Sequence, residues 1–242
     1  MDTKDNSHSN ERSIAFWGDS LTEGFPGASY FEILKKRLPG CKLFNYGKGG
    51  DTVVSLYHRL KSLQLNKPVD IAFLWVGVND VFVNISPSYP IIKTINKQPW
   101  SREHEEFEHY YRLTLELLYQ AATRVITVPP LFMGEDINNQ WNKEIEALSR
   151  IIEKVSASYE NVAYLDLRTI IFPKLVDQNI SEYLPESATR VALDVILLKQ
   201  TEQIDKKSSE RGLLFTLDGV HLNSRGAETV ADIFLEMIQL IS

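Results

Sequence analysis

The chain has 242 residues, of which 43% are hydrophobic and 24% are charged, and its net charge is −6. This length is typical of a single α/β domain, and the composition excludes disorder over most of the chain. The negative charge disfavours nucleic acids and anionic membranes as partners, because both need a surface rich in lysine and arginine.

Residues 1–12 are polar and mixed in charge, and they predict a disordered tail. They lack the apolar stretch of a signal peptide, and no later segment is long and apolar enough to span a membrane. We therefore expect a cytoplasmic protein without stable membrane insertion, although a secreted protein trimmed of its signal fits the same sequence. The single cysteine, Cys41, excludes an intrachain disulfide and a cysteine-based zinc site.

The first half of the chain alternates between apolar runs, which predict strands, and runs with helical spacing. In chain order we expect a strand at 13–17, a helix at 30–38, a strand at 42–46, a helix at 52–63 and a strand at 69–76. A glycine follows each strand closely. We expect Asp51 to be the N-cap of the second helix.

The second half continues this alternation around two irregular segments. Residues 81–100 contain three prolines and no periodicity, so they predict a long loop or an excursion from the domain. The elements that follow are a helix at 101–122, a strand at 124–128, a helix at 138–158 and a strand at 162–167. Residues 170–215 predict a second excursion with a helix at about 187–207, and an amphipathic helix at 224–241 ends the chain.

Five strands that alternate with helices predict one α/β domain over 13–242. Parallel strands need crossover connections, so we expect a parallel sheet with helices on both faces. In such sheets, ligands bind outside the carboxyl ends of the strands. Three of the four motifs described next follow strand ends, and the fourth precedes the last helix.

The first motif, Gly18-Asp19-Ser20-Leu21, follows the first strand. A serine there lies at the carboxyl edge of the sheet, and glycine lets the chain turn sharply. The motif differs from the G-x-S-x-G nucleophile elbow, because Thr22 stands where the second glycine would be. On its own, it is better explained as a turn with a serine that caps a helix.

The second and third motifs contain groups that could donate hydrogen bonds to a ligand. In Gly47-Lys48-Gly49-Gly50-Asp51, glycine allows close approach of a backbone N–H, but the order does not match a Walker phosphate loop. In Gly77-Val78-Asn79-Asp80, the asparagine amide could donate to an oxyanion. A plain turn explains the second motif about as well, and the third motif better.

The fourth motif, Asp218-Gly219-Val220-His221, places a carboxylate three residues before an imidazole. Asp218 could accept a hydrogen bond from one ring nitrogen of His221 and leave the other free to take a proton from a hydroxyl. The alternative is that Asp218 and His221 are ordinary surface residues at the start of a helix.

In this order, the four motifs resemble the four signature blocks of the SGNH hydrolases, also called the GDSL esterase/lipase family. The resemblance extends from about Ile14 to the C-terminus and is weaker over 81–100 and 170–215. It implies a three-layer α/β/α sandwich with a flavodoxin-like, five-stranded parallel sheet. It also implies hydrolysis of carboxylic esters, with no metal and no organic cofactor.

The resemblance assigns a catalytic triad to this chain. Ser20 would be the nucleophile. His221 would be the general base and then the acid that protonates the leaving alcohol. Asp218 would hold His221 in place.

The resemblance also assigns three donors to an oxyanion hole. These are the backbone N–H groups of Ser20 and Gly50 and the side chain of Asn79. Gly49 is an alternative to Gly50, which we prefer because Asp51 follows it as in the family block.

Other residues are candidates for a pocket or for a metal site. Phe25, Phe82 and Trp100 are aromatic side chains that could line an acyl or sugar pocket. His104 and His109 lie among glutamates, but they are five residues apart, whereas a helical zinc site needs a spacing of four. We therefore expect no metal.

Several functions stay open. Acetylated sugars, short acyl esters, and lysophospholipids or acyl thioesters are all possible substrates for such an esterase. A non-catalytic module that binds carbohydrate or a partner is an alternative against which the four intact motifs argue, and a flavodoxin-like nucleotide or flavin binder would need a phosphate loop. Because both irregular segments leave from the carboxyl edge of the sheet, we expect them to wall a small pocket that favours acetyl to butyryl esters. The oligomeric state stays open.

Overall fold

One sheet of five parallel strands forms the centre of the computed structural model, which describes residues 11–63, 68–85, 87–176, 181–184 and 200–241. The strand order is β2-β1-β3-β4-β5. The strands are β1 (Arg12–Gly18), β2 (Cys41–Gly47), β3 (Val69–Trp75), β4 (Ala122–Val128) and β5 (Val162–Tyr164). All five predicted strands are therefore confirmed. Arg12 belongs to β1 and not to the predicted tail, whose residues 1–10 lie outside the described part.

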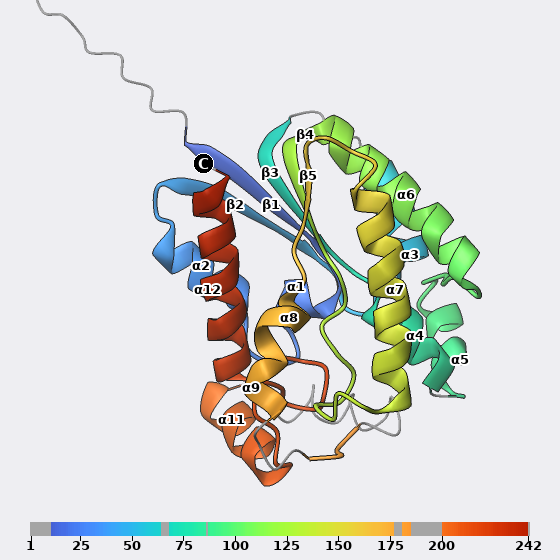
Figure 1. Ribbon diagram of the computed structural model, residues 1–242, viewed down its shortest axis with the longest axis vertical. Coiled ribbons are helices and arrows are strands. Elements are labelled where there is room, and N and C mark those ends of the chain that lie inside the picture. The colour runs from blue at the N-terminus through green and yellow to red at the C-terminus, as the bar shows by residue number, and fades with distance from the viewer. Residues whose placement is uncertain (1–10, 64–67, 86, 177–180, 185–199, 242) are drawn as a thin grey trace, which may run out of the picture.

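Helices cover both faces of the sheet, which gives the predicted three layers (Figure 1). On one face α2 (Tyr30–Arg37) packs against α12 (Ser224–Leu240). On the other face α6 packs against both α3 and α7; these helices are α3 (Val53–Ser62), α6 (His104–Ala121) and α7 (Gln140–Ser156). The chain runs from β1 outward to β2 and then crosses back to β3 on the other side of β1. This reversal separates the loops after β1 and β3, and such a point commonly holds the ligand.

Residues 81–100, predicted as a long loop or an excursion, are not an irregular loop. Two helices, α4 (Val78–Ile85) and α5 (Tyr89–Ile95), occupy most of this segment. The prolines misled the prediction because Pro87 and Pro99 lie outside the two helices, and the third lies where a helix tolerates proline. Pro90 is in the first turn of α5, where a missing N–H breaks no helical hydrogen bond.

The second excursion contains short helices in its described parts. These are α8 (Leu167–Ile171), α9 (Pro173–Val176) and α11 (Thr201–Glu210). The strand predicted to reach residue 167 ends at Tyr164, and Asp166 caps α8 instead. Residues 185–199, which include most of the helix predicted at 187–207, lie outside the described residues.

The N-cap of α3 is Thr52 and not Asp51 as predicted. The Thr52 hydroxyl accepts a hydrogen bond from the Ser55 N–H, and the Ser55 hydroxyl accepts one from the Thr52 N–H. This reciprocal pair is a capping box. It leaves the carboxylate of Asp51 available for other partners, which belong to the candidate site.

Aromatic packing fixes α12 against the sheet. The ring of Phe234 lies 4.6 Å from the ring of Phe73, 5.8 Å from that of Trp75 and 6.3 Å from that of Phe16. All four side chains are buried. Because α12 begins three residues after His221, this packing also fixes the end of the loop that carries His221. No described helix is long and apolar enough to cross a membrane.

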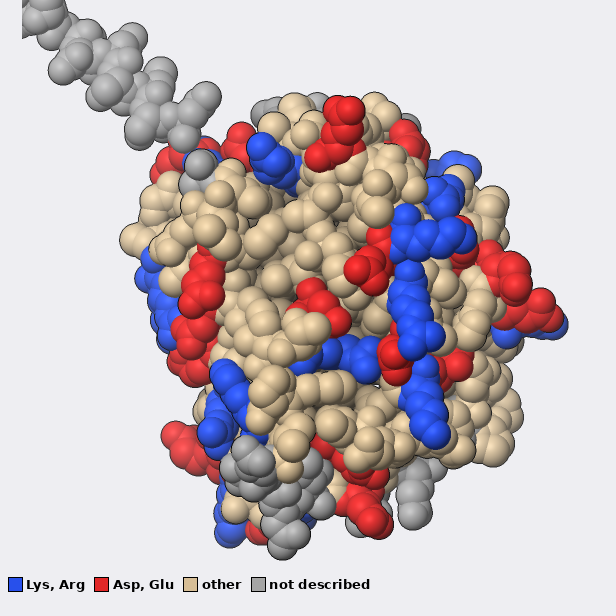
Figure 2. Space-filling view, viewed as in Figure 1, with Lys and Arg blue, Asp and Glu red and all other residues tan. Residues whose placement is uncertain are grey.

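Charged side chains of both signs lie side by side on the face shown in Figure 2. Exposed ion pairs also link surface helices. Arg37 bonds to Glu228 and Asp232, and Arg150 pairs with Glu146 one helical turn away. Such exposed pairs contribute little stability, at most about 1 kcal/mol each.

Candidate active site

Ser20 lies where β1 passes into the short helix α1 (Ser20–Glu23). Asp19 is the N-cap of this helix, and its carboxylate accepts a hydrogen bond from the Leu21 N–H at 3.0 Å. Ser20 is the first helical residue, so its own N–H has no acceptor within the helix. Gly18 is required by packing rather than by a turn, because a Cβ there would lie 2.3 Å from the Trp75 carbonyl oxygen.

Ser20, His221 and Asp218 form a continuous chain of hydrogen bonds. The Ser20 Oγ lies 2.9 Å from His221 Nε2, and His221 Nδ1 lies 2.8 Å from Asp218 Oδ2. An ionised Asp218 can only accept, so Nδ1 carries the proton and Nε2 can accept from the serine hydroxyl. The arrangement can therefore remove a proton from Ser20.

The charge state of Asp218 suits this arrangement. Burial by itself raises the pKa of this carboxyl, but the neighbouring His221 and the N–H groups of Val220 and His221 lower the pKa below its usual value. The two N–H groups donate to Oδ1 at 3.0 and 2.8 Å. Asp218 is therefore ionised at neutral pH although it is fully buried.

A buried glutamate that the sequence analysis missed positions the segment before Asp218. Glu135 is 1% exposed and accepts four hydrogen bonds. The N–H of Leu214 donates to Oε2, whereas the N–H of Phe215 and both the N–H and the hydroxyl of Thr216 donate to Oε1, at 2.6 to 2.8 Å. No sequence signal identifies Glu135, because three of its four donors are backbone groups about 80 positions away.

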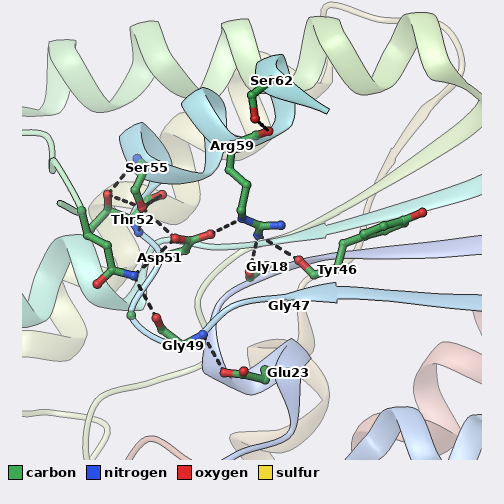
Figure 3. A network of polar contacts seen from close by, with 12 residues as sticks. Gly18, Glu23, Tyr46, Gly47, Gly49, Asp51, Thr52, Ser55, Arg59 and Ser62 are labelled. Carbon is green, nitrogen blue, oxygen red and sulfur yellow. Dashed lines mark hydrogen bonds and ion pairs between the residues drawn. The ribbon is translucent and has the colours of Figure 1, made fainter. Parts of the chain in front are cut away.

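A second buried network fixes the loop after β2 (Figure 3). Arg59 of α3 donates from Nε to Asp51 Oδ2 at 2.8 Å and from its terminal nitrogen to the carbonyl oxygen of Tyr46 at 2.8 Å. The same nitrogen lies 3.4 Å from the carbonyl oxygen of Gly18. Arg59 therefore links the ends of β1 and β2 to the residue that follows Gly50.

The two glycines proposed as alternatives differ in their hydrogen bonds. The Gly49 N–H donates to Glu23 Oε2 at 2.6 Å. Among the described residues, the Gly50 N–H has no acceptor, and Gly50 adopts φ +77°, which favours glycine. Both residues line the same cavity as Ser20. Gly50 is therefore the better placed donor.

A cavity of about 460 Å³ lies over these groups, and Ser20, Gly50, Asn79 and His221 all line it. Its apolar wall includes two of the predicted aromatic residues and is formed by Phe25, Pro26, Val78, Phe82, Ile92, Met133 and Val220. Trp100 is half-buried and is not among the described residues that line this cavity. Its predicted place in the pocket is thus wrong.

Three further titratable groups are buried beside the site. Burial raises the pKa of Asp19 to about 7 and the pKa of Asp80 to about 6. Burial also lowers the pKa of Lys93 to about 8, against the opposing effect of the nearby carboxylates of Asp80 and Asp19. Lys93 comes from α5, lines the cavity, and donates from Nζ to the Gly50 carbonyl oxygen.

Within the described residues, no group of three or more histidine, cysteine or acidic side chains is arranged to hold a metal ion. His104 lies 2.6 Å from Glu144 of α7.

Comparison with known proteins places the chain in a family. The sequence profile of the GDSL-like lipase/acylhydrolase family matches residues 16–229. The chain belongs to this family. It is therefore a carboxylic ester hydrolase with the α/β fold of GDSL esterases. A comparison with curated protein sequences gave no match.

Three solved structures with similar folds illustrate the likeness. The acetyl xylan esterase AlAXEase is 22% identical, with a TM-score of 0.63 over 93% of this chain and 99% of its own. Axe2, an acetylxylan esterase from Geobacillus stearothermophilus, is 17% identical, with a TM-score of 0.61 over 94% of each chain. A lipolytic protein of the G-D-S-L family from Veillonella parvula is 16% identical, with a TM-score of 0.62 over 94% of this chain and 98% of its own.

Glu135→Gln tests the role of the buried glutamate. The glutamine oxygen can replace Oε1 and keep three hydrogen bonds, but its amide nitrogen then faces the Leu214 N–H, so two donors meet. We expect the free energy of unfolding to fall by about 1–3 kcal/mol and ester hydrolysis to weaken. Urea denaturation and an esterase assay measure these effects. Glu160→Gln, at an exposed glutamate, is the control, and equal stability of the two variants would refute the role.

Proposed function

We propose that this GDSL hydrolase is a serine esterase that forms an acyl-enzyme on Ser20. The observation that carries the proposal is the buried hydrogen-bond chain from Ser20 through His221 to Asp218, which opens on a cavity. A free serine hydroxyl is hardly ionised at neutral pH, so it needs an adjacent base to become a nucleophile. The chain of hydrogen bonds supplies that base.

The first half of the reaction acylates the enzyme. His221 Nε2 takes the proton of the Ser20 hydroxyl while Oγ attacks the ester carbonyl carbon, and Asp218 stabilises the resulting imidazolium. The carbonyl oxygen becomes an oxyanion, which accepts hydrogen bonds from the N–H groups of Ser20 and Gly50 and from the Asn79 amide, each worth about 3 kcal/mol. His221 then protonates the alcohol oxygen as the carbon–oxygen bond breaks, and the alcohol leaves.

The second half releases the acid. Water loses a proton to His221 and attacks the acyl carbon, and the same donors stabilise the second oxyanion. When this intermediate collapses, His221 returns its proton to Ser20 Oγ. The cycle consumes one ester and one water and yields one alcohol and one acid. These steps need no metal and no organic cofactor.

We propose that the substrates are esters with short acyl groups, among them acetylated carbohydrates. Two features support this. The cavity of about 460 Å³ must hold the acyl group and part of the alcohol, and α4 and α5 wall it with Phe82 and Ile92. Two structures that share the fold are described as acetyl xylan esterases. Lysophospholipase or acyl-thioesterase activity is the alternative substrate class, and a non-catalytic carbohydrate- or partner-binding module is the alternative of another class.

We propose further that residues 13–242 form a single domain. The family profile spans most of this range, and the described helices pack around one sheet.

Ser20→Ala is the direct test of the nucleophile. Loss of Oγ removes the acylation step, so hydrolysis of p-nitrophenyl acetate should fall by on the order of 10⁴-fold or more. Labelling by a fluorophosphonate probe should disappear, while the circular dichroism spectrum stays unchanged. Ser158→Ala, at an exposed serine, is the matched control. Near wild-type turnover in a folded Ser20→Ala protein would exclude Ser20, and a wild-type protein that neither turns over esters nor takes the probe would favour the binding module.

The pH profile tests the base. His221 must be unprotonated to accept the serine proton, so kcat/KM should rise with pH through an apparent pKa near the ordinary histidine value of about 6.5. Asp19 titrates in the same range, because burial raises the pKa of its carboxyl to about 7. The wild-type profile alone therefore does not identify the base.

Asp19→Asn separates the two groups, because asparagine caps a helix as well as aspartate does. The rise of kcat/KM with pH should persist in this variant. Its disappearance in a folded protein would assign the titration to Asp19 instead of His221.

A series of p-nitrophenyl esters from acetate to palmitate tests the substrate proposal. We expect kcat/KM to be highest from acetyl to butyryl and to fall steeply beyond about eight carbons as the cavity fills. Phe82→Ala should shift the preference toward longer chains, and Phe44→Ala on β2, away from the cavity, should not. If kcat/KM is highest for the palmitate ester, the short-acyl proposal is wrong, but the assignment of Ser20 as the nucleophile stands.

A further inference from the structure

We propose that Tyr89 and Gln98 are positioning residues that set the direction of two oxyanion donors, the Asn79 amide and the Gly50 N–H. The inference rests on the proposed function, because it concerns the donors of that reaction. Both residues come from one segment, α5 and the turn after it, which the sequence analysis treated as a loop. Neither residue has a role in the proton transfers.

The Asn79 amide is bound on two sides. Its Nδ2 donates to the Asp51 carbonyl oxygen at 3.1 Å, and its Oδ1 accepts from the Tyr89 hydroxyl at 2.7 Å. A backbone carbonyl can only accept, so the atom that faces Asp51 must be the amide nitrogen. This pairing leaves one N–H of the amide for a ligand, and Asn79 lines the cavity.

The Tyr89 hydroxyl is a dependable donor in this place. Burial, together with the nearby carboxylates of Asp19 and Asp80, raises the pKa of Tyr89 well above its usual value, so the phenol keeps its proton. A donor on Oδ1 prevents the amide from rotating about its last side-chain bond. It also polarises the amide, which strengthens the remaining N–H as a donor.

Gln98 acts on the other donor through a shared peptide group. The Gly50 N–H belongs to the peptide that joins Gly49 to Gly50, and the carbonyl oxygen of this peptide accepts from Gln98 Nε2 at 2.9 Å. In a planar trans peptide the C=O and N–H bonds point in opposite directions, so fixing one fixes the other. A Cβ on Gly50 would lie 2.9 Å from Gln98 Oε1, which shows how closely Gln98 packs on this loop.

Lys93, between these two residues in the chain, binds the following peptide. Its Nζ donates to the Gly50 carbonyl oxygen and lies 4.7 Å from the centre of the Tyr89 ring. One segment therefore contacts both sides of the loop that carries the Gly50 N–H.

A double-mutant cycle on Tyr89 and Asn79 tests the inference. Tyr89→Phe removes only the hydroxyl and keeps the ring that lines the cavity. With p-nitrophenyl acetate, we expect kcat to fall on the order of 10-fold in Tyr89→Phe and 100-fold in Asn79→Ala, with little change in KM. Tyr89→Phe combined with Asn79→Ala should be no slower than Asn79→Ala alone, because Tyr89 acts through Asn79.

Gln98→Leu extends the test to the second donor. We expect kcat to fall on the order of 10-fold, and the effect should multiply with that of Tyr89→Phe because the two residues serve different donors. Ile95→Ala, at a side chain of α5 that is 74% exposed, is the control and should keep the wild-type kcat. The melting temperature of each variant separates a change in rate from a loss of fold.

The outcomes are distinct. A Tyr89→Phe variant with wild-type kcat overturns the positioning role while the proposed function stands. A combined variant that is slower than Asn79→Ala by the full Tyr89→Phe factor overturns it as well, because Tyr89 would then act on the substrate directly. If kcat falls only in proportion to the fraction of unfolded protein in each variant, Tyr89 and Gln98 have a purely structural role. If Asn79→Ala keeps the wild-type kcat, Asn79 is not an oxyanion donor, and Tyr89 then has no positioning role through it.

Discussion

Four hydrogen bonds to one buried carboxylate, that of Glu135, hold the segment from Leu214 to Thr216 on which half of the site depends. Ser20 follows β1 by two residues and begins α1, so a central strand and the Asp19 cap position it. Asp218 and His221 come from irregular chain outside the sheet, 201 positions from Ser20 in the case of His221. A contact of 2.9 Å between groups so distant in sequence requires that both supports be rigid. Glu135 supplies the second support, and the packing of α12 closes the loop from its other end.

The reversal of strand order at β1 creates the space above Ser20, because β2 and β3 lie on opposite sides of β1. The loops after β1 and β3 separate there, and the loop after β2 closes one side. That loop would be free to move if glycine alone determined its path. The ion pair between Asp51 and Arg59 restrains it, and Arg59 also bonds the ends of the strands beneath it (Figure 3). The loop after β2 needs glycine at position 50 for its conformation, and the ion pair of the next residue, Asp51, with Arg59 holds it in place.

The sequence predicted the sheet well, because buried strands depend on local pattern. Apolar runs bounded by glycine identify buried strands, and the carboxyl edge of a parallel sheet then brings Ser20, Gly50 and Asn79 together. The helices at 81–100 escaped prediction because α4 has only eight residues and α5 only seven, so neither shows the repeated spacing of a long helix. Glu135 and Gln98 escaped for a different reason. Their partners are backbone groups far along the chain, and every residue has the same backbone groups, so the sequence does not show which of them is the partner.

The position of α5 has a consequence for how such an enzyme can change. Tyr89 and Ile92 form part of the cavity wall, while Tyr89 and Lys93 also contact the groups that surround the ester carbonyl. Widening the cavity from this side would therefore disturb the chemistry along with the fit. Phe25 and Met133 line the cavity from other segments, and the hydrogen bonds found for them use their backbone groups, which a substitution retains. Substitutions at those two positions could therefore adapt the cavity to bulkier esters, in natural or directed evolution, without disturbing the catalytic groups. Substitutions in α5 would change the substrate range and the catalytic rate together.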